Sequence, residues 1–151
     1  MTTLEILAAR EMKRGPMPPT ALSLTLTYED RFIRRKRLIT DQGEAVLVDL
    51  AETTSIDHGD ALVLTDGRMV TVLAAKEELL EVRGENLTRL AWHIGNRHTP
   101  CQIGQGRLLI KDDHVMADML IRLGADLARV TEPFTPEGGA YGHGRTHGHA
   151  H

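Results

Sequence analysis

The chain has few aromatic residues, a single cysteine and no excess of positive charge. Phe, Trp and Tyr make up 3% of its 151 residues, so any core must be built from aliphatic side chains. Cys101 is the only cysteine, which excludes an internal disulfide and any paired-cysteine metal or redox motif. The formal net charge is −3, so there is no overall basic field of the kind that binds nucleic acid. We therefore expect no nucleic-acid partner.

Long apolar runs are also absent. None approaches the roughly 18 residues of a membrane span, and the apolar segment at residues 4–9 is short and interrupted by Glu5, unlike a secretory signal. These features predict a cytoplasmic protein with no membrane partner. The length fits one ordinary domain or two very small ones, and two small domains would each be marginal alone, which favours oligomerisation.

Residues 1–75 are predicted to form a small all-β domain. Residues 22–28 alternate apolar and polar side chains, as a half-buried strand does. Two hairpins are expected, one across residues 41–44 and one across Asp66-Gly67, a strong short hairpin signal. Residues 15–19 contain three prolines and are expected to be irregular.

Within this half, residues 31–37 hold five basic residues in seven. One interpretation is the solvated face of a strand whose charges discourage pairing at a sheet edge. The alternative is a surface that binds RNA or an acidic partner. Phe32 is the only aromatic residue in the segment and no recognised RNA-binding motif is present, which favours the first interpretation.

Residues 76–135 are predicted to form a second domain with the element order βαββαβ. The expected elements are a strand at 78–82, a helix at 86–95, strands at 101–103 and 107–111, a helix capped by Asp112 or Asp113 and ended by Gly124, and a strand at 126–131. This order is the split βαβ of ferredoxin-like domains. The predicted fold class is therefore α+β.

Two histidines lie around the end of the first of these helices. Asn86 is the expected N-cap, and Gly95 with Asn96 is expected to supply the left-handed residues that end the helix. His93 lies at the rim of the apolar stripe, and His98 lies just past the helix end. A zinc-protease helix needs histidines at i and i+4 with a Glu between them, so this pair, five residues apart with no carboxylate between, is not one. From the residues alone, the pair either complements the helix dipole or binds metal.

The composition changes again after Pro136. Residues 136–151 are rich in Gly and His, with almost nothing to bury. Such a composition is typical of a disordered, metal-binding tail. Its candidate ligands are His143, His147, His149 and His151.

The segment His93-Ile94-Gly95-Asn96-Arg97-His98 resembles the His-aliphatic-Gly-Asn-Arg-His signature of the UreE family, the urease accessory nickel metallochaperones. In that family the second histidine of the signature is the principal metal ligand, contributed by both subunits of a dimer. The resemblance therefore implies that His98 binds Ni(II) at the axis of a homodimer. The His-rich tail is a second point of similarity.

A third point of similarity is the start of the second helix. In the family, a His-Asp-His element commonly opens this helix and adds secondary metal ligands. Here Asp112 replaces the first of those histidines, which leaves Asp112 and His114 as a candidate pair. The alternative is that the aspartates only cap the helix. His93 and Cys101 are further candidate ligands, although Cys101 also fits a small buried strand residue.

The function implied by the resemblance is that of a nickel-binding metallochaperone that delivers Ni(II) during assembly of the urease active site. The implied partners are a urease accessory GTPase and the urease apoprotein complex, and the first domain would be peptide-binding. No nucleophile–base pair or phosphate loop is apparent, so the protein is not expected to be an enzyme. Imidazole ligands would also accept Cu(II) or Zn(II). The alternatives are a general divalent-metal buffer or sensor, and an RNA- or partner-binding adaptor that acts through residues 31–37.

Overall fold

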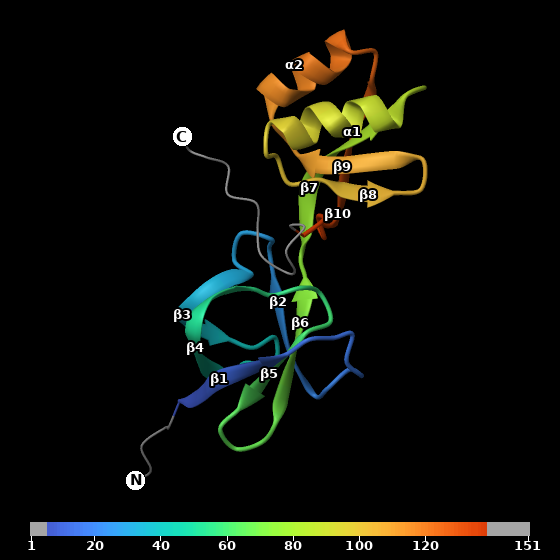
Figure 1. Ribbon diagram of the computed structural model, residues 1–151. Helices are drawn as coiled ribbons and strands as arrows, with labels where there is room; N and C mark the ends of the chain where they lie inside the picture. Colours follow the sequence, from blue (N-terminus) through green and yellow to red (C-terminus); the bar gives the residue numbers. More distant parts are fainter. Residues whose placement is uncertain (1–5, 139–151) are drawn as a thin grey trace. The chain divides into compact units, whose positions relative to one another are not determined.

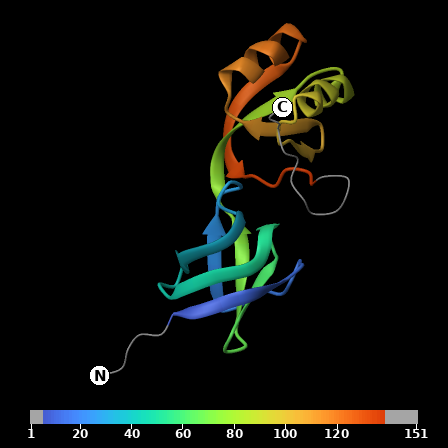
Figure 2. The same cartoon turned by 60° about the vertical axis from the view of Figure 1, so that its left-hand side comes forward.

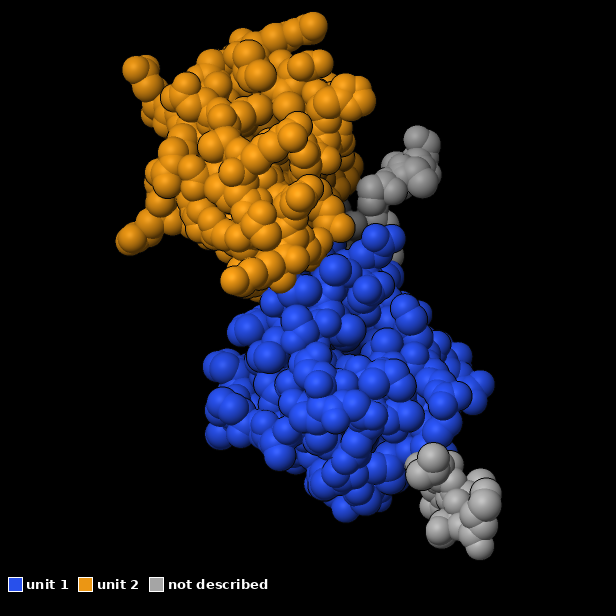
Figure 3. Space-filling view, turned by 180° about the vertical axis from the view of Figure 1, so that it is seen from behind, with its two compact units in different colours: residues 1–75 blue, residues 76–151 orange. Residues whose placement is uncertain are grey.

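The computed structural model describes residues 6–138. The chain divides into two compact units, Met1–Ala75 and Lys76–His151, coloured separately in Figure 3. Strands predominate in both units, and the helices of the described residues all belong to the second unit. The predicted α+β class is therefore confirmed.

Unit 1 is a six-stranded mixed sheet with the strand order β2-β6-β5-β1-β4-β3 (Figures 1 and 2). Its strands are β1 (Leu7–Lys13), β2 (Leu22–Leu26), β3 (Phe32–Ile39), β4 (Ala45–Ser55), β5 (Ala61–Leu64) and β6 (Met69–Ala74). The sequence pattern does not predict β1, which nevertheless lies between β5 and β4. A register shift between Ala9 and Glu11 explains this, because a bulge interrupts the period of two.

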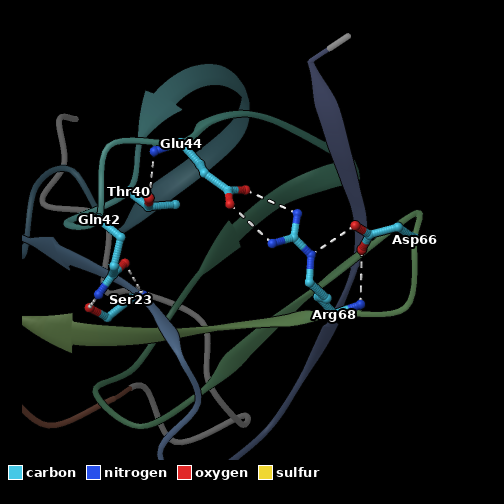
Figure 4. Close-up of polar contacts among 6 residues, drawn as sticks. All are labelled: Ser23, Thr40, Gln42, Glu44, Asp66 and Arg68. Carbon is cyan, nitrogen blue, oxygen red and sulfur yellow. Dashed lines mark hydrogen bonds and ion pairs between the residues drawn. The ribbon is translucent and has the colours of Figure 1, made fainter. Parts of the chain in front are cut away.

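The core of unit 1 is aliphatic, as the scarcity of aromatic residues predicts. It is built from buried Leu, Val, Ile and Ala side chains such as Leu24, Val48 and Leu62. Both predicted hairpins are present, with Gly43 and Gly67 at φ values of 95° and 92°. The side chain of Arg68 joins the two turns, because it donates to both carboxylate oxygens of Glu44 and to Asp66 (Figure 4).

Arg31 does not belong to the exposed basic segment in which the sequence places it. Arg31 is only 2% exposed. The guanidinium donates to the carbonyl oxygens of Ile56 and Leu26 at 3.0 Å each, and it lies over the ring of Tyr28. Arg31 is therefore a structural residue that satisfies buried carbonyl groups.

Unit 2 has a four-stranded antiparallel sheet with the strand order β10-β7-β9-β8. Its elements are β7 (Lys76–Arg83), α1 (Leu87–Asn96), β8 (Gln102–Gly104), β9 (Arg107–Lys111), α2 (His114–Arg122) and β10 (Asp126–Pro133). Both helices pack on one face of the sheet (Figure 1), where Leu90, Ile94, Met116 and Leu120 meet Leu80, Val82 and Ile110. The methionines of α2 are thus core residues.

The ends of α2 follow the predicted pattern. Of the two candidate aspartates, Asp113 is the N-cap, since its side chain accepts from the backbone N–H groups of Val115 and Met116. Gly124 follows the helix at a φ of 89°, the left-handed residue that the sequence predicts. Neither helix within residues 6–138 is long and apolar enough to cross a membrane. The four tail histidines lie outside the described residues.

Candidate metal-binding site

Helix α1 positions the signature histidines. Its Asn86 side chain accepts from the backbone N–H of Arg89, which confirms the predicted N-cap. Leu90 and Ile94 are buried, and Leu87 and Ala91 pack against the same core. The apolar stripe therefore faces the sheet as its periodicity predicts.

The prediction for the end of α1 is wrong in one respect. Gly95 and Asn96 are both helical, and the left-handed residue is His98, at a φ of 56°. The backbone N–H of His98 donates to Gly95 O at 2.9 Å, and that of Thr99 donates to Ile94 O at 3.4 Å. These two bonds make a Schellman motif with His98 at the position that glycine usually occupies.

His98 is exposed and lies on the rim of a hollow of about 210 Å³. The residues that line the hollow include His98, Pro100, Cys101, Ile103, Glu137 and Gly138. The last two come from the segment that follows β10. This segment is held against β8 because the backbone N–H of Glu137 donates to Cys101 O at 2.9 Å and that of Thr135 donates to the Gln102 side chain at 2.8 Å.

Cys101 is a partly buried thiol in this hollow. Burial and the nearby charge of Glu137 raise its pKa to about 11. The thiol is therefore protonated at neutral pH, and a metal ion would have to displace that proton. Cys101 also packs against the core of unit 2, as expected for a small strand-edge residue.

Glu137 is the residue of this hollow that sequence reasoning misses. It lies 36 positions beyond Cys101 in a segment without regular structure. No local pattern indicates that this segment returns to β8. Only the hydrogen bonds of the folded chain bring its carboxylate to the same hollow as His98.

His93 does not share the hollow of His98. It is half-buried on α1, and its ring meets that of Trp92 edge-to-face, with 5.0 Å between the ring centroids. Trp92 itself is 63% exposed. The two signature histidines therefore point to different surroundings.

Asp112 and His114 line different hollows. Asp112 lies beside Glu78 and forms an ion pair of 3.6 Å with Arg129. His114, the first residue of α2, lines a different hollow together with Asp118. Within residues 6–138, no three side chains of His, Cys, Asp or Glu come together closely enough to hold a metal ion.

Both units match known protein families. Residues 4–75 match the N-terminal domain of the UreE urease accessory protein, and residues 77–151 match its C-terminal domain. A urease accessory protein UreE of Ruegeria pomeroyi is 63% identical over 149 residues, which cover 98% of this chain and 100% of the relative. The urease accessory protein UreE of Cereibacter sphaeroides is 59% identical, and the alignment covers 95% of this chain and 79% of the relative. That of Rhodobacter capsulatus is 54% identical, and the alignment covers 95% of this chain and 92% of the relative. The chain belongs to the UreE family of urease accessory proteins.

Proposed function

We propose that this protein is a nickel metallochaperone, not itself an enzyme, that delivers Ni(II) while the urease active site is assembled. In this proposal two copies of the chain share one nickel ion through their His98 side chains, and tail histidines complete the coordination shell. The observation that carries the proposal is the position of His98, exposed on the rim of a hollow that Gly138 also lines.

The backbone of His98 supports a functional role for its side chain. A left-handed conformation costs a non-glycine residue roughly 1–2 kcal/mol. Helix α2 ends in the same motif with Gly124 at the equivalent position and avoids that cost. A histidine at a position that suits glycine is consistent with a requirement for imidazole, since strained residues gather at functional sites.

The start of the tail supports a contribution from the tail histidines. Gly138 lines the hollow of His98, and His143 follows five residues later. Five residues can span up to about 17 Å. A histidine tethered so close has an effective concentration on the order of millimolar at the site, without needing a fixed position before it binds.

The available donors suit a metal ion that must be passed on. Neutral imidazole binds nickel, copper and zinc, so Cu(II) and Zn(II) would compete for the same ligands. Because the raised pKa of Cys101 disfavours its thiolate, the site is expected to rely on nitrogen and oxygen donors. A single imidazole holds such an ion weakly, whereas a two-fold axis doubles every ligand placed beside it.

The remaining features of the proposal concern fold and partners. We infer a ferredoxin-like metal-binding domain at residues 76–135, which the strand order β10-β7-β9-β8 supports. The first domain, residues 1–75, would be peptide-binding, and residues 136–151 would form the tail. The partners would be the urease accessory GTPase and the urease apoprotein complex in the cytoplasm.

Calorimetric titration with nickel tests the proposal on the full-length protein, the His98→Ala variant and a chain truncated after Gly142. His98→Ala should abolish the tightest step, and truncation should lower the number of ions bound. His93→Ala is the matched control, because His93 lies on α1, five residues before His98, but outside the hollow. Sedimentation equilibrium of the same samples should show a dimer. An intact tight step in His98→Ala would instead indicate a buffer based on the tail.

A further inference from the structure

Strand β3 presents a row of positive charge at the edge of the unit 1 sheet. It is the last strand in the sheet order and has β4 as its only hydrogen-bonded neighbour within the described residues. Arg34, Arg35, Lys36 and Arg37 are all exposed. With Arg31 buried, these four consecutive side chains are the surface that the basic segment offers to a partner.

These charges are poorly neutralised by the protein itself. Arg35 lies 3.7 Å from Asp49 and Lys36 lies 3.9 Å from Asp30, at the limit of an ion pair, and both basic side chains are more than half exposed. The side chains of Arg34 and Arg37 form no ion pair or hydrogen bond with any other residue of the described range 6–138. Arg68 in the same unit differs, since two carboxylates hold it at 2.8–3.0 Å (Figure 4).

The register of β3 indicates where its backbone groups point. The N–H of Thr40 donates to Glu44 O across the turn to β4, whereas the N–H of Asp41 donates away from β4, to Ser23 O. Because this direction alternates along an antiparallel strand, the backbone groups of Arg35 and Arg37 also point away from β4. They therefore face the side of β3 that β4 leaves open, and this open stretch ends at Asp41, where Ser23 of β2 lies on the same side.

The side chains of Arg35 and Arg37 share one face of the strand. They lie opposite Asp49 and Leu47 of β4, whereas Lys36 lies opposite the buried Val48. The same face carries Ile39, which is 59% exposed. A strand added at this edge would meet unpaired backbone groups, two cations spaced by two residues, and an apolar side chain.

Resting on the peptide-binding role proposed above for residues 1–75, we propose that the β3 edge binds an acidic, extended segment of a partner protein by strand addition. Carboxylates at every second position of that segment would face Arg35 and Arg37, while its backbone pairs with theirs. A second copy of β3 is a poor occupant because it would place like charges opposite one another. RNA is also a poor occupant, since Phe32 is the only aromatic side chain of β3 on which a base could stack.

The test uses the full-length protein and a short, end-capped, fluorescent peptide of alternating valine and glutamate. The control peptide has the same sequence with every backbone nitrogen methylated, so it keeps the side chains and the charge and loses all backbone donors. Arg37→Glu should weaken binding of the alternating peptide about fivefold to thirtyfold, because attraction at an exposed site becomes repulsion. Arg10→Glu is the matched control: Arg10 is also exposed, but it lies on the interior strand β1.

Amide hydrogen exchange locates the bound strand. The N–H groups of Arg35 and Arg37 should exchange more slowly when the alternating peptide is bound, whereas that of Lys36, which faces β4, should change little. The nickel stoichiometry should be the same in Arg37→Glu and Arg10→Glu, which separates this surface from the metal site.

Several results would overturn the proposal. One is no binding at peptide concentrations on the order of millimolar in low salt, which would leave the charges as protection against edge pairing. Others are equal weakening by Arg10→Glu, equal binding of the N-methylated peptide, or unchanged exchange at Arg35 and Arg37. Tighter binding of single-stranded polyuridylate without amide protection would indicate a nucleic-acid surface instead.

Discussion

Replacing His98 by glycine should stabilise the metal-free protein and remove its tight nickel site. The φ of 56° at His98 costs an L-residue roughly 1–2 kcal/mol. Glycine avoids this cost but loses about 0.4–1 kcal/mol through the greater freedom of the unfolded chain. At the midpoints of these two ranges the net gain is about 0.8 kcal/mol, or roughly 3–6 °C in Tm for a unit of this size.

Nickel should reverse the order of stability of wild type and His98→Gly. At a free nickel concentration of about 100 times Kd, a bound site stabilises the folded protein by about 2.7 kcal/mol. Wild-type protein should gain this stabilisation, whereas His98→Gly should gain only what weaker sites supply. Thermal unfolding at fixed protein concentration, with a chelator and then with nickel, therefore ranks the two proteins in opposite orders.

Gly124→Ala is the matched control for the backbone effect. Gly124 has a φ of 89° at the same position of α2, and a Cβ added there meets no atom within 4 Å. The expected loss on substitution is about 0.8 kcal/mol, the same difference as for His98→Gly with the opposite sign, and it is conformational, with no steric clash. Nickel binding should be unchanged in this variant. The reasoning is refuted if metal-free His98→Gly is less stable than wild type, or if it keeps the tight nickel step.

Three other outcomes are expected. Truncation after Gly142 combined with His98→Ala should be non-additive at the tight site, by calorimetry, because both changes remove ligands from one coordination shell. Nickel affinity should fall steeply between about pH 7.5 and about pH 5.5, since protons compete with nickel for the imidazole nitrogens; an affinity that keeps rising towards the pKa of Cys101, about 11, would indicate a thiolate ligand instead. Arg107→Gln should destabilise unit 2 by about 1 kcal/mol near neutral pH and by less in acid, as measured by urea unfolding. Hydrogen bonds from Arg107 lower the pKa of Glu132, and hydrogen bonds from Arg83 and Arg107 lower the pKa of Glu81. This stabilisation is therefore present above the unfolded pKa of 4.5 and is lost as the pH falls through the folded pKa values. An equal difference in stability between the two proteins at every pH would contradict this explanation.

The elements of unit 2 follow from local sequence patterns. The apolar stripe of α1, the N-cap at Asn86, and the ending of α2 at Gly124 each depend on residues within a few positions of one another. Hairpin turns such as Asp66-Gly67 are local in the same sense. The exposure of His98 is also predictable from the sequence, because this residue follows the helix end, beyond the apolar stripe that packs on the sheet.

Long-range contacts decide the rest. The bulge in β1 hides that strand from a period-of-two pattern, and Arg31 is buried only because carbonyl groups of Leu26 and Ile56 converge on it. The left-handed conformation of His98, by contrast, depends on local hydrogen bonds, from its own N–H to Gly95 O and from Thr99 N–H to Ile94 O.

The composition of the His98 hollow is likewise a tertiary property. Sequence predicts a histidine past a helix and a histidine-rich tail, but gives no indication that Glu137 and Gly138 lie at the same hollow. Their position depends on hydrogen bonds between an irregular segment and strand β8, which lies more than 30 residues earlier. Periodicity describes only neighbours along the chain, so a donor–acceptor pair that closes a long loop becomes visible only once the chain is folded.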